Sequence, residues 1–161
     1  MSFLNKIPVL LFVISISITT HAQTTNNDQA DRAEVVQVLQ QFQDGYTNRD
    51  TLVIDEFLTL FSDDIVYIGI ASYEFFKGKA SVRKLTIWDW KSWFDLKMPF
   101  ENANIRIDKN VAWFEVVGAS GPWRNGNTYE IRMVGSLVKN KDKWIFKQIC
   151  FSYPSPLKEV E

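Results

Sequence analysis

The sequence predicts an α+β domain in which three helices from the N-terminal half pack on an antiparallel sheet. Residues 111–154 contain three apolar segments separated by turn signals, and the last two alternate between two faces as paired antiparallel strands do. Before residue 100, apolar side chains recur mainly at helical spacing. Because a sheet of this kind must bury one face, we expect the upstream helices to cover it.

Residues 1–22 predict a cleaved signal peptide, and hence a secreted or periplasmic protein. A short start with one positive charge, Lys6, precedes the nearly unbroken apolar run 7–18. Thr20-His21-Ala22 then places small residues before a signal-peptidase cut. The run of roughly 12 residues is too short to span a bilayer comfortably, although an uncleaved anchor is the alternative. No cysteine follows it, which argues against a lipoprotein.

The composition of the remaining 139 residues excludes several classes of protein. Removing Lys6 leaves 17 basic and 19 acidic side chains, and a net charge of −2 argues against nucleic acid or an anionic membrane as partner. The single histidine, His21, is lost with the signal, which excludes histidine-dependent catalytic triads and histidine-ligated zinc. One cysteine, Cys150, allows no internal disulfide, so the domain depends on its core.

No cluster of Asp, Glu, His or Cys has the spacing of metal ligands, and Ser62-Asp63-Asp64 is interpreted as a turn. We therefore expect neither a metal site nor a cofactor.

The first helix is expected to begin near Asp31 or Ala33, after a disordered lead at 23–30. Its core stripe recurs at spacings of four, three and four residues, in Val35, Leu39, Phe42 and Tyr46. Gly45 could admit a neighbour or a ligand, or merely weaken the end of the helix.

Two further helices are predicted. A short one is capped by Asp50 or Thr51 and should bury Leu52, Phe57, Leu60 and Phe61. A third spans 79–97 and should bury Val82, Leu85, Ile87 or Trp88, Trp93 and Leu96, before Pro99 stops it.

The strands are predicted at 65–70, 73–76, 100–107, 111–119, 128–139 and 143–153. Polar turns at 108–110 and 140–142 indicate hairpins, and 120–127 forms a longer loop carrying Trp123. The tail 157–161 is expected to fray.

Glu115 and Arg132 are the charged side chains of most interest on these strands. Pairing the apolar sets of the two strands on one face places both charges on the other, together with Glu130. The register with Glu115 opposite Arg132 is favoured, because Glu115 opposite Glu130 would repel. The pair is either a surface ion pair of little energetic value or part of a site.

The last strand has no purely polar face, which predicts a second buried surface. If one alternating set faces the helices, the other exposes Ile149, Phe151 and Tyr153, more apolar area than a monomer usually shows. We expect a homodimer packed through the outer sheet face. The 23 aromatic residues also suggest a lined cavity, and Tyr46, Tyr67, Trp88 and Trp113 are either core or pocket wall.

Three segments make the chain similar to the SnoaL-like family of the nuclear transport factor 2-like superfamily: IDEFLTLFSDDIVYIG followed by Gly78, VAWFEV, and WIFKQICFSYPSP. The resemblance covers residues 31–156. It implies a cone-shaped fold, a curved sheet wrapped by three helices, a pocket between them and frequent dimers. Relatives often carry histidines on the last strand, where this chain has Gln148 and Cys150, so those two residues are expected at the pocket and histidine chemistry is not.

Three functions remain open. The first is an exported pocket protein that binds a small, largely apolar molecule without turnover, as a homodimer. The second is a lyase or isomerase that uses Glu115 as the base, Tyr46 or Tyr67 as hydrogen-bond donor and Arg132 to stabilise negative charge. That mechanism requires Glu115 to be buried. The third is a non-catalytic interaction module.

Overall fold

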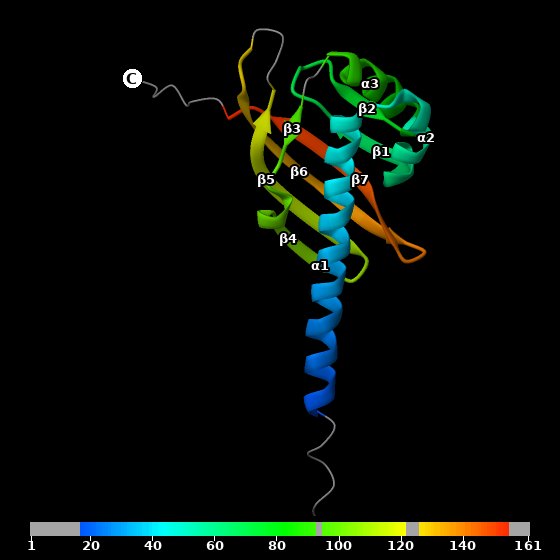
Figure 1. Ribbon diagram of the computed structural model, residues 1–161. Coiled ribbons are helices and arrows are strands. Elements are labelled where there is room, and N and C mark those ends of the chain that lie inside the picture. The colour runs from blue at the N-terminus through cyan, green and yellow to red at the C-terminus, as the bar shows by residue number, and fades with distance from the viewer. Residues whose placement is uncertain (1–16, 93–94, 122–125, 155–161) are drawn as a thin grey trace, which may run out of the picture.

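A curved sheet is covered on one face by helices, as the computed structural model shows (Figure 1). The structure describes residues 17–92, 95–121 and 126–154, with the side chains of 17–27 left aside. Most of the expected signal peptide, Trp93, Trp123 and the tail 157–161 lie outside the described residues. The predicted α+β fold class, with helices on an antiparallel sheet, is confirmed.

In the described part of the chain, seven strands form one sheet in the order β2-β1-β7-β6-β5-β3, with β4 also paired to β5. Every pairing is antiparallel except that of β1 with β7. The strands are β1 (Phe61–Ile68), β2 (Phe75–Lys77), β3 (Leu96–Lys97), β4 (Asn104–Asp108), β5 (Val111–Ser120), β6 (Tyr129–Asn140) and β7 (Lys143–Ser152).

The three long C-terminal strands lie within one residue of their predicted ends. The turn between β6 and β7 sets the end of one strand and the start of the next. Lys141 and Asp142 both have positive φ there, as a two-residue hairpin turn requires. The start of one predicted strand and one predicted turn were wrong. The interval predicted as a strand from residue 100 begins with a short 3₁₀ helix, Phe100–Asn102, and Ser62-Asp63-Asp64 lies inside β1 rather than in a turn.

Helix α1 (Ser17–Asn48) crosses the sheet and projects beyond it at its N-terminal end (Figure 1). It begins 14 residues before the predicted start at Asp31, and residues 23–30 are helical rather than a disordered lead. Asp31 and Arg32 are the first described side chains to contact the sheet, through Lys139 and the carbonyl groups of β4 and the residue before it. Once packing has nucleated a helix, adding further residues to its end costs little free energy. The extension therefore needs no apolar stripe, and the spacing of apolar residues did not predict it.

The predicted core positions of α1, namely Val35, Leu39, Phe42 and Tyr46, are all confirmed as buried. The next segment comprises α2 (Ile54–Phe57) between the 3₁₀ helices Thr51–Val53 and Leu58–Leu60. Asp50 caps it as predicted, accepting a hydrogen bond from the Leu52 N–H at 2.9 Å. Leu52 is 91% exposed, contrary to prediction, because the change of helix type turns Ile54 inward instead.

Helix α3 (Lys79–Ser92) ends five residues before its predicted end at residue 97, and Leu96–Lys97 forms β3 instead. In the described part of the chain, no helix is both long and apolar enough to cross a membrane.

A β-bulge in β7 decides which of its side chains face the helices. Leu137 pairs with Phe146 and Ser136 with Gln148, so Lys147 is the extra residue. The inward positions therefore change from Trp144 and Phe146 to Ile149 and Phe151, and all four are buried. The expectation that Ile149 and Phe151 form an outer apolar surface was wrong, because it assumed unbroken alternation.

We predict that Phe151→Asp abolishes folding instead of producing monomers. Its ring packs against Phe42 and Tyr67 at centroid distances of 6.2 and 5.7 Å, so a charge there would be buried without a partner. Phe151→Ala should lower the free energy of unfolding by about 3–5 kcal/mol. Circular dichroism with urea titration measures both effects, and Val134→Asp, on the exposed face of β6, should stay folded. A folded, monomeric Phe151→Asp protein would contradict the assignment.

Candidate functional site

Three buried polar side chains meet between α1, β1 and α3, and we call them the Tyr–Tyr–Asp cluster: Tyr46, Tyr67 and Asp89. The Tyr46 hydroxyl donates a hydrogen bond to Asp89 Oδ2 at 2.8 Å. The hydroxyl oxygens of Tyr46 and Tyr67 are 3.4 Å apart. Each of the three residues is only 3% exposed. Hydroxyl and carboxyl groups thus form a short chain inside an otherwise aromatic core.

Each residue of the cluster is placed by the regular geometry of its element. Tyr46 ends the core stripe of α1, and Tyr67 follows Ile65 on the inward face of β1. Asp89 comes seven residues after Val82 on the buried face of α3, two helical turns further along. The local pattern of all three segments therefore directs these polar groups inward.

Burial controls the protonation of the cluster. Burial raises the pKa of Asp89 to about 7; the hydrogen bond from Tyr46 lowers it, and the charge of Glu74 adds to the increase. Burial, followed by the charge of Asp89, also raises the pKa of Tyr46 and of Tyr67 well above 10. Both phenols therefore remain hydrogen-bond donors at neutral pH, while Asp89 exchanges between acid and base. That combination suits proton transfer.

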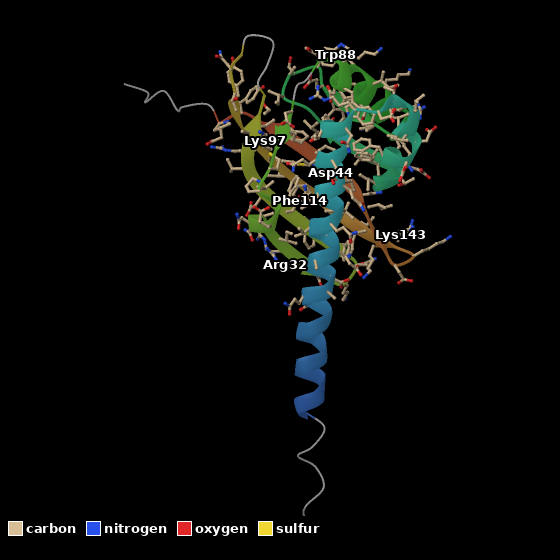
Figure 2. All side chains as sticks on the ribbon, in the orientation of Figure 1. Arg32, Asp44, Trp88, Lys97, Phe114 and Lys143 are labelled. Atoms are coloured by element: carbon tan, nitrogen blue, oxygen red, sulfur yellow. The ribbon has the colours of Figure 1, made fainter. Side chains whose placement is uncertain are left out.

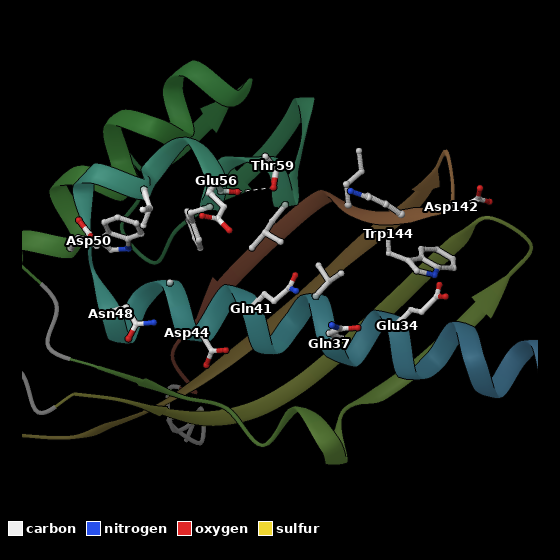
Figure 3. A pocket seen from close by; sticks show the side chains of 18 residues that line it. Glu34, Gln37, Gln41, Asp44, Asn48, Asp50, Glu56, Thr59, Asp142 and Trp144 are labelled. Carbon is white, nitrogen blue, oxygen red and sulfur yellow. Dashed lines mark hydrogen bonds between the residues drawn. The ribbon is translucent and has the colours of Figure 1, made fainter.

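A groove runs along one side of α1 (Figure 3). Its volume is about 690 Å³, within the usual range for ligand pockets, and it lies between α1, the α2 segment and the start of β7. Phe57 and Trp90 line it, with ring centroids 5.2 Å apart. Phe57 also packs on Tyr46, at 6.1 Å, and fills the space that a side chain at Gly45 would need. The Phe57–Trp90 pair therefore separates the groove from the cluster.

The structure brings together only two of the predicted ligand-binding residues in the interior, Tyr46 and Tyr67. Trp88 is 53% exposed and lies at the α3 end of the molecule (Figure 2). Trp113 and Gln148 share a shallow hollow of about 280 Å³ on the outer sheet face, where Ser136 pairs with both. Cys150 is partly buried in β7 and pairs with Val134.

Glu115 and Arg132 do not form the predicted pair. Glu115 lies opposite Val134, and Arg132 opposite Val117, a register shifted by two residues from the favoured one. Glu115 instead accepts a hydrogen bond from Asn104 and forms an ion pair with Arg106 at 3.6 Å. Its side chain is 51% exposed, so the burial that a carboxylate base requires is absent. Among the described carboxyl groups, Asp89 meets that requirement.

The sequence prediction missed Asp89, although a signal for it exists. Val82 and Leu85 were correctly placed on the buried face of the third helix, and the same phase points residue 89 inward. An acidic residue at a core position of an amphipathic helix is uncommon, because it must be desolvated. The spacing of buried residues along the third helix would therefore have identified Asp89 as an inward-facing residue.

We predict that Asp89→Asn makes the protein more stable at high pH. The raised pKa means that the folded state holds an extra proton between about pH 4 and 7, so the free energy of unfolding of the native protein falls as pH rises through that window. The loss is on the order of 4 kcal/mol. Asparagine does not titrate, so the variant should lack this pH dependence. Urea unfolding at pH 5 and pH 8 measures the free energy of unfolding of both proteins. Asp108→Asn, at an exposed position, is the control and should change the free energy of unfolding little at either pH. Equal pH dependence in the native protein and in Asp89→Asn would refute the raised pKa of Asp89.

Comparison with known proteins identifies the family of the chain and the structures that share its fold. The pattern of the SnoaL-like domain matches residues 35–156. No curated protein sequence matches the chain.

Several solved structures share the fold at low identity. An NTF2-like protein of unknown function from Pseudomonas putida KT2440 is 15% identical, with a TM-score of 0.67 over 83% of this chain and 93% of that one. An NTF2-like protein with a cystatin-like fold from Novosphingobium aromaticivorans is 10% identical, with a TM-score of 0.71 over 88% and 94%. A putative ketosteroid isomerase from Parabacteroides distasonis is 15% identical, with a TM-score of 0.56 over 75% and 88%.

With its family pattern extending over most of the sequence, the chain belongs to the SnoaL-like family, and it shares its fold with these NTF2-like structures.

Proposed function

We propose that the chain binds a small, largely apolar molecule beside the Tyr–Tyr–Asp cluster and moves a proton on it, as an isomerase or lyase. The observation that carries this proposal is Asp89, a buried carboxyl group with a pKa of about 7 and no cationic partner among the described residues. Such a group destabilises the fold at neutral pH, and burial of this kind is a recurring property of catalytic acids and bases.

The chemistry follows from the two kinds of group present. Ionised Asp89 removes a proton from a carbon next to a carbonyl group, and the electron pair moves onto the carbonyl oxygen. A tyrosine hydroxyl donates a hydrogen bond to that oxygen and stabilises the enolate. Protonated Asp89 then returns the proton to a different carbon, which is isomerisation, or to a leaving hydroxyl group, which is dehydration.

The groove supports a route to the cluster. In this structure the cluster is closed, and the Phe57–Trp90 pair is the wall that a ligand in the groove would contact. Rotation of these two rings would open the cluster to the groove without breaking a described hydrogen bond, because the Trp90 Nε1 atom has no partner.

The test measures exchange of ketone α-protons with D₂O by NMR, because exchange reports enolisation without knowledge of the product. Ketosteroids belong in the panel, since a structural neighbour is described as a putative ketosteroid isomerase. We expect the rate to rise with pH through about 7 as Asp89 ionises. Asp89→Asn should reduce it by about 100-fold or more.

Tyr67→Phe should reduce the exchange rate by about tenfold, through loss of one hydrogen-bond donor. Glu115→Gln, on the outer face, should leave it unchanged. A protein that binds ketones without any exchange would instead support binding without turnover, the alternative that the closed cluster favours.

The proposal includes export and a homodimer. The core positions of α1 begin at Val35, so cleavage after Ala22 would remove no described core residue, and an intact mass beginning at Gln23 tests it. The outer sheet face carries Trp113, Val117 and Val134, which are 48%, 50% and 42% exposed, and these apolar side chains support a dimer through that face.

We expect Val134→Asp to convert a dimer into monomers, since an isologous interface would bring two buried charges together. Gel filtration with light scattering measures the mass. Asp substituted for the exposed Leu52, outside the sheet, is the control and should not change it. A monomeric native protein, or a dimeric Val134→Asp variant, would contradict this interface.

A further inference from the structure

Glu74 lies in the loop between β1 and β2, where hydrogen bonds fix its side chain. The Gly69 N–H donates to the Glu74 carbonyl at 2.8 Å, and the Glu74 N–H donates to the Ala71 carbonyl at 2.9 Å. The Ala71 N–H in turn donates to Glu74 Oε2 at 3.0 Å. The loop therefore holds this carboxylate folded back over Gly69.

The side chain of Glu74 lies over Gly69, on the inner side of the sheet. Side chains alternate along β1, and because Ile65 and Tyr67 point inward, position 69 also faces inward. A Cβ atom on Gly69 would collide with Glu74 Oε2 and lie 2.7 Å from Glu74 Cβ. The Glu74 side chain thus occupies the inward space left by the glycine. After burial, the larger cause, its charge adds to the raised pKa of Asp89, Tyr67 and Tyr153.

Neither carboxyl group has a cationic partner in the described part of the chain. Within the described residues, no Lys or Arg forms an ion pair with Asp89 or Glu74. The groove on the other side of the Phe57–Trp90 wall has the same sign of charge. Five carboxylate residues and one lysine line it: Glu34, Asp44, Asp50, Glu56, Asp142 and Lys143. Glu34 is paired with Lys139 at 3.0 Å, so the excess of negative charge comes from the other four carboxylates. The approach and the interior therefore both carry negative potential.

We propose that Glu74 is the specificity-determining residue of this site, which accepts uncharged or amine-bearing molecules and rejects carboxylates and phosphates. The inference rests on the proposed function, because it concerns the ligand of the same cluster. An anionic group beside Tyr67 would face Glu74 and Asp89 in a partly desolvated space, where like charges repel strongly. An ammonium group there would form an ion pair with Glu74, and a hydroxyl group would donate a hydrogen bond to it.

The test compares three probes built on one ring system: 2-naphthylmethylamine, 2-naphthol and 2-naphthoate. At pH 7.5 they carry one positive charge, no charge and one negative charge. Isothermal titration calorimetry on the full chain should give an affinity for the amine at least about tenfold above that for the naphthoate, with the naphthol between them.

Glu74→Gln keeps the size of the side chain and an oxygen to accept from Ala71, and should reduce the ratio of amine to naphthoate affinity by about tenfold. Exposed Glu101→Gln is the matched control and should leave the ratio unchanged. Equal binding of amine and naphthoate to the native protein, or an unchanged ratio in Glu74→Gln, would overturn the inference.

A second measurement needs no ligand. The titratable groups facing Asp89 are Tyr46 from α1, Tyr67 from β1 and Glu74 from the loop. Glu74→Gln should therefore lower the pH at which the Asp89 carboxyl carbon titrates by NMR, whereas Glu101→Gln should not. An unchanged midpoint overturns the role of Glu74.

The outcomes also separate this inference from the proposed function. Proton exchange without charge preference leaves the function standing and removes the inference. Charge preference without proton exchange keeps the inference about Glu74 and removes the proposed proton transfer. If none of the three probes binds, both the inference and the interior site fall.

Discussion

The packing of Phe42 against β7 is the contact on which the rest of the interior depends. Its ring meets Phe146 at 5.5 Å and Phe151 at 6.2 Å, and these two residues lie on opposite sides of the bulge at Lys147. Without the extra residue, only one of them could face α1. The bulge therefore lets one helix cover the full length of the last strand, and it positions Phe151 against Tyr67, at the edge of the Tyr–Tyr–Asp cluster.

Aromatic packing gives the cluster its properties as well as its shape. Rings contacting Tyr46 and Tyr67 exclude water, and this desolvation is the main cause of the raised pKa values of all three members. A carboxyl group in such surroundings reduces the stability of the folded protein at neutral pH. Fold stability and the proposed chemistry thus make opposite demands on position 89, which is a frequent compromise at functional sites.

The two faces of the sheet divide the polar groups by role. On the outer face, Glu115 and Arg106 pair in contact with water, where an ion pair has little effect on stability or reactivity. On the inner face, Glu74 and Asp89 have no such partner in the described chain, and their charges act over short distances in a medium of low polarity. The same type of side chain is therefore ion-paired on the outer face and, among the described residues, without a cationic partner on the inner face.

The sequence by itself determined the fold class, the hairpins and the core stripe of α1, because alternation, turn residues and helical spacing are local properties. It also supplied Tyr46 and Tyr67 as candidates. Only the tertiary structure decided the switch of faces in β7, the register that separates Glu115 from Arg132, and the meeting of Asp89 with the tyrosines. These depend on one extra residue in a strand, on the pairing of distant strands and on contacts 43 residues apart in the chain. Helical phase can turn Asp89 inward, but no local pattern determines which side chains it meets there.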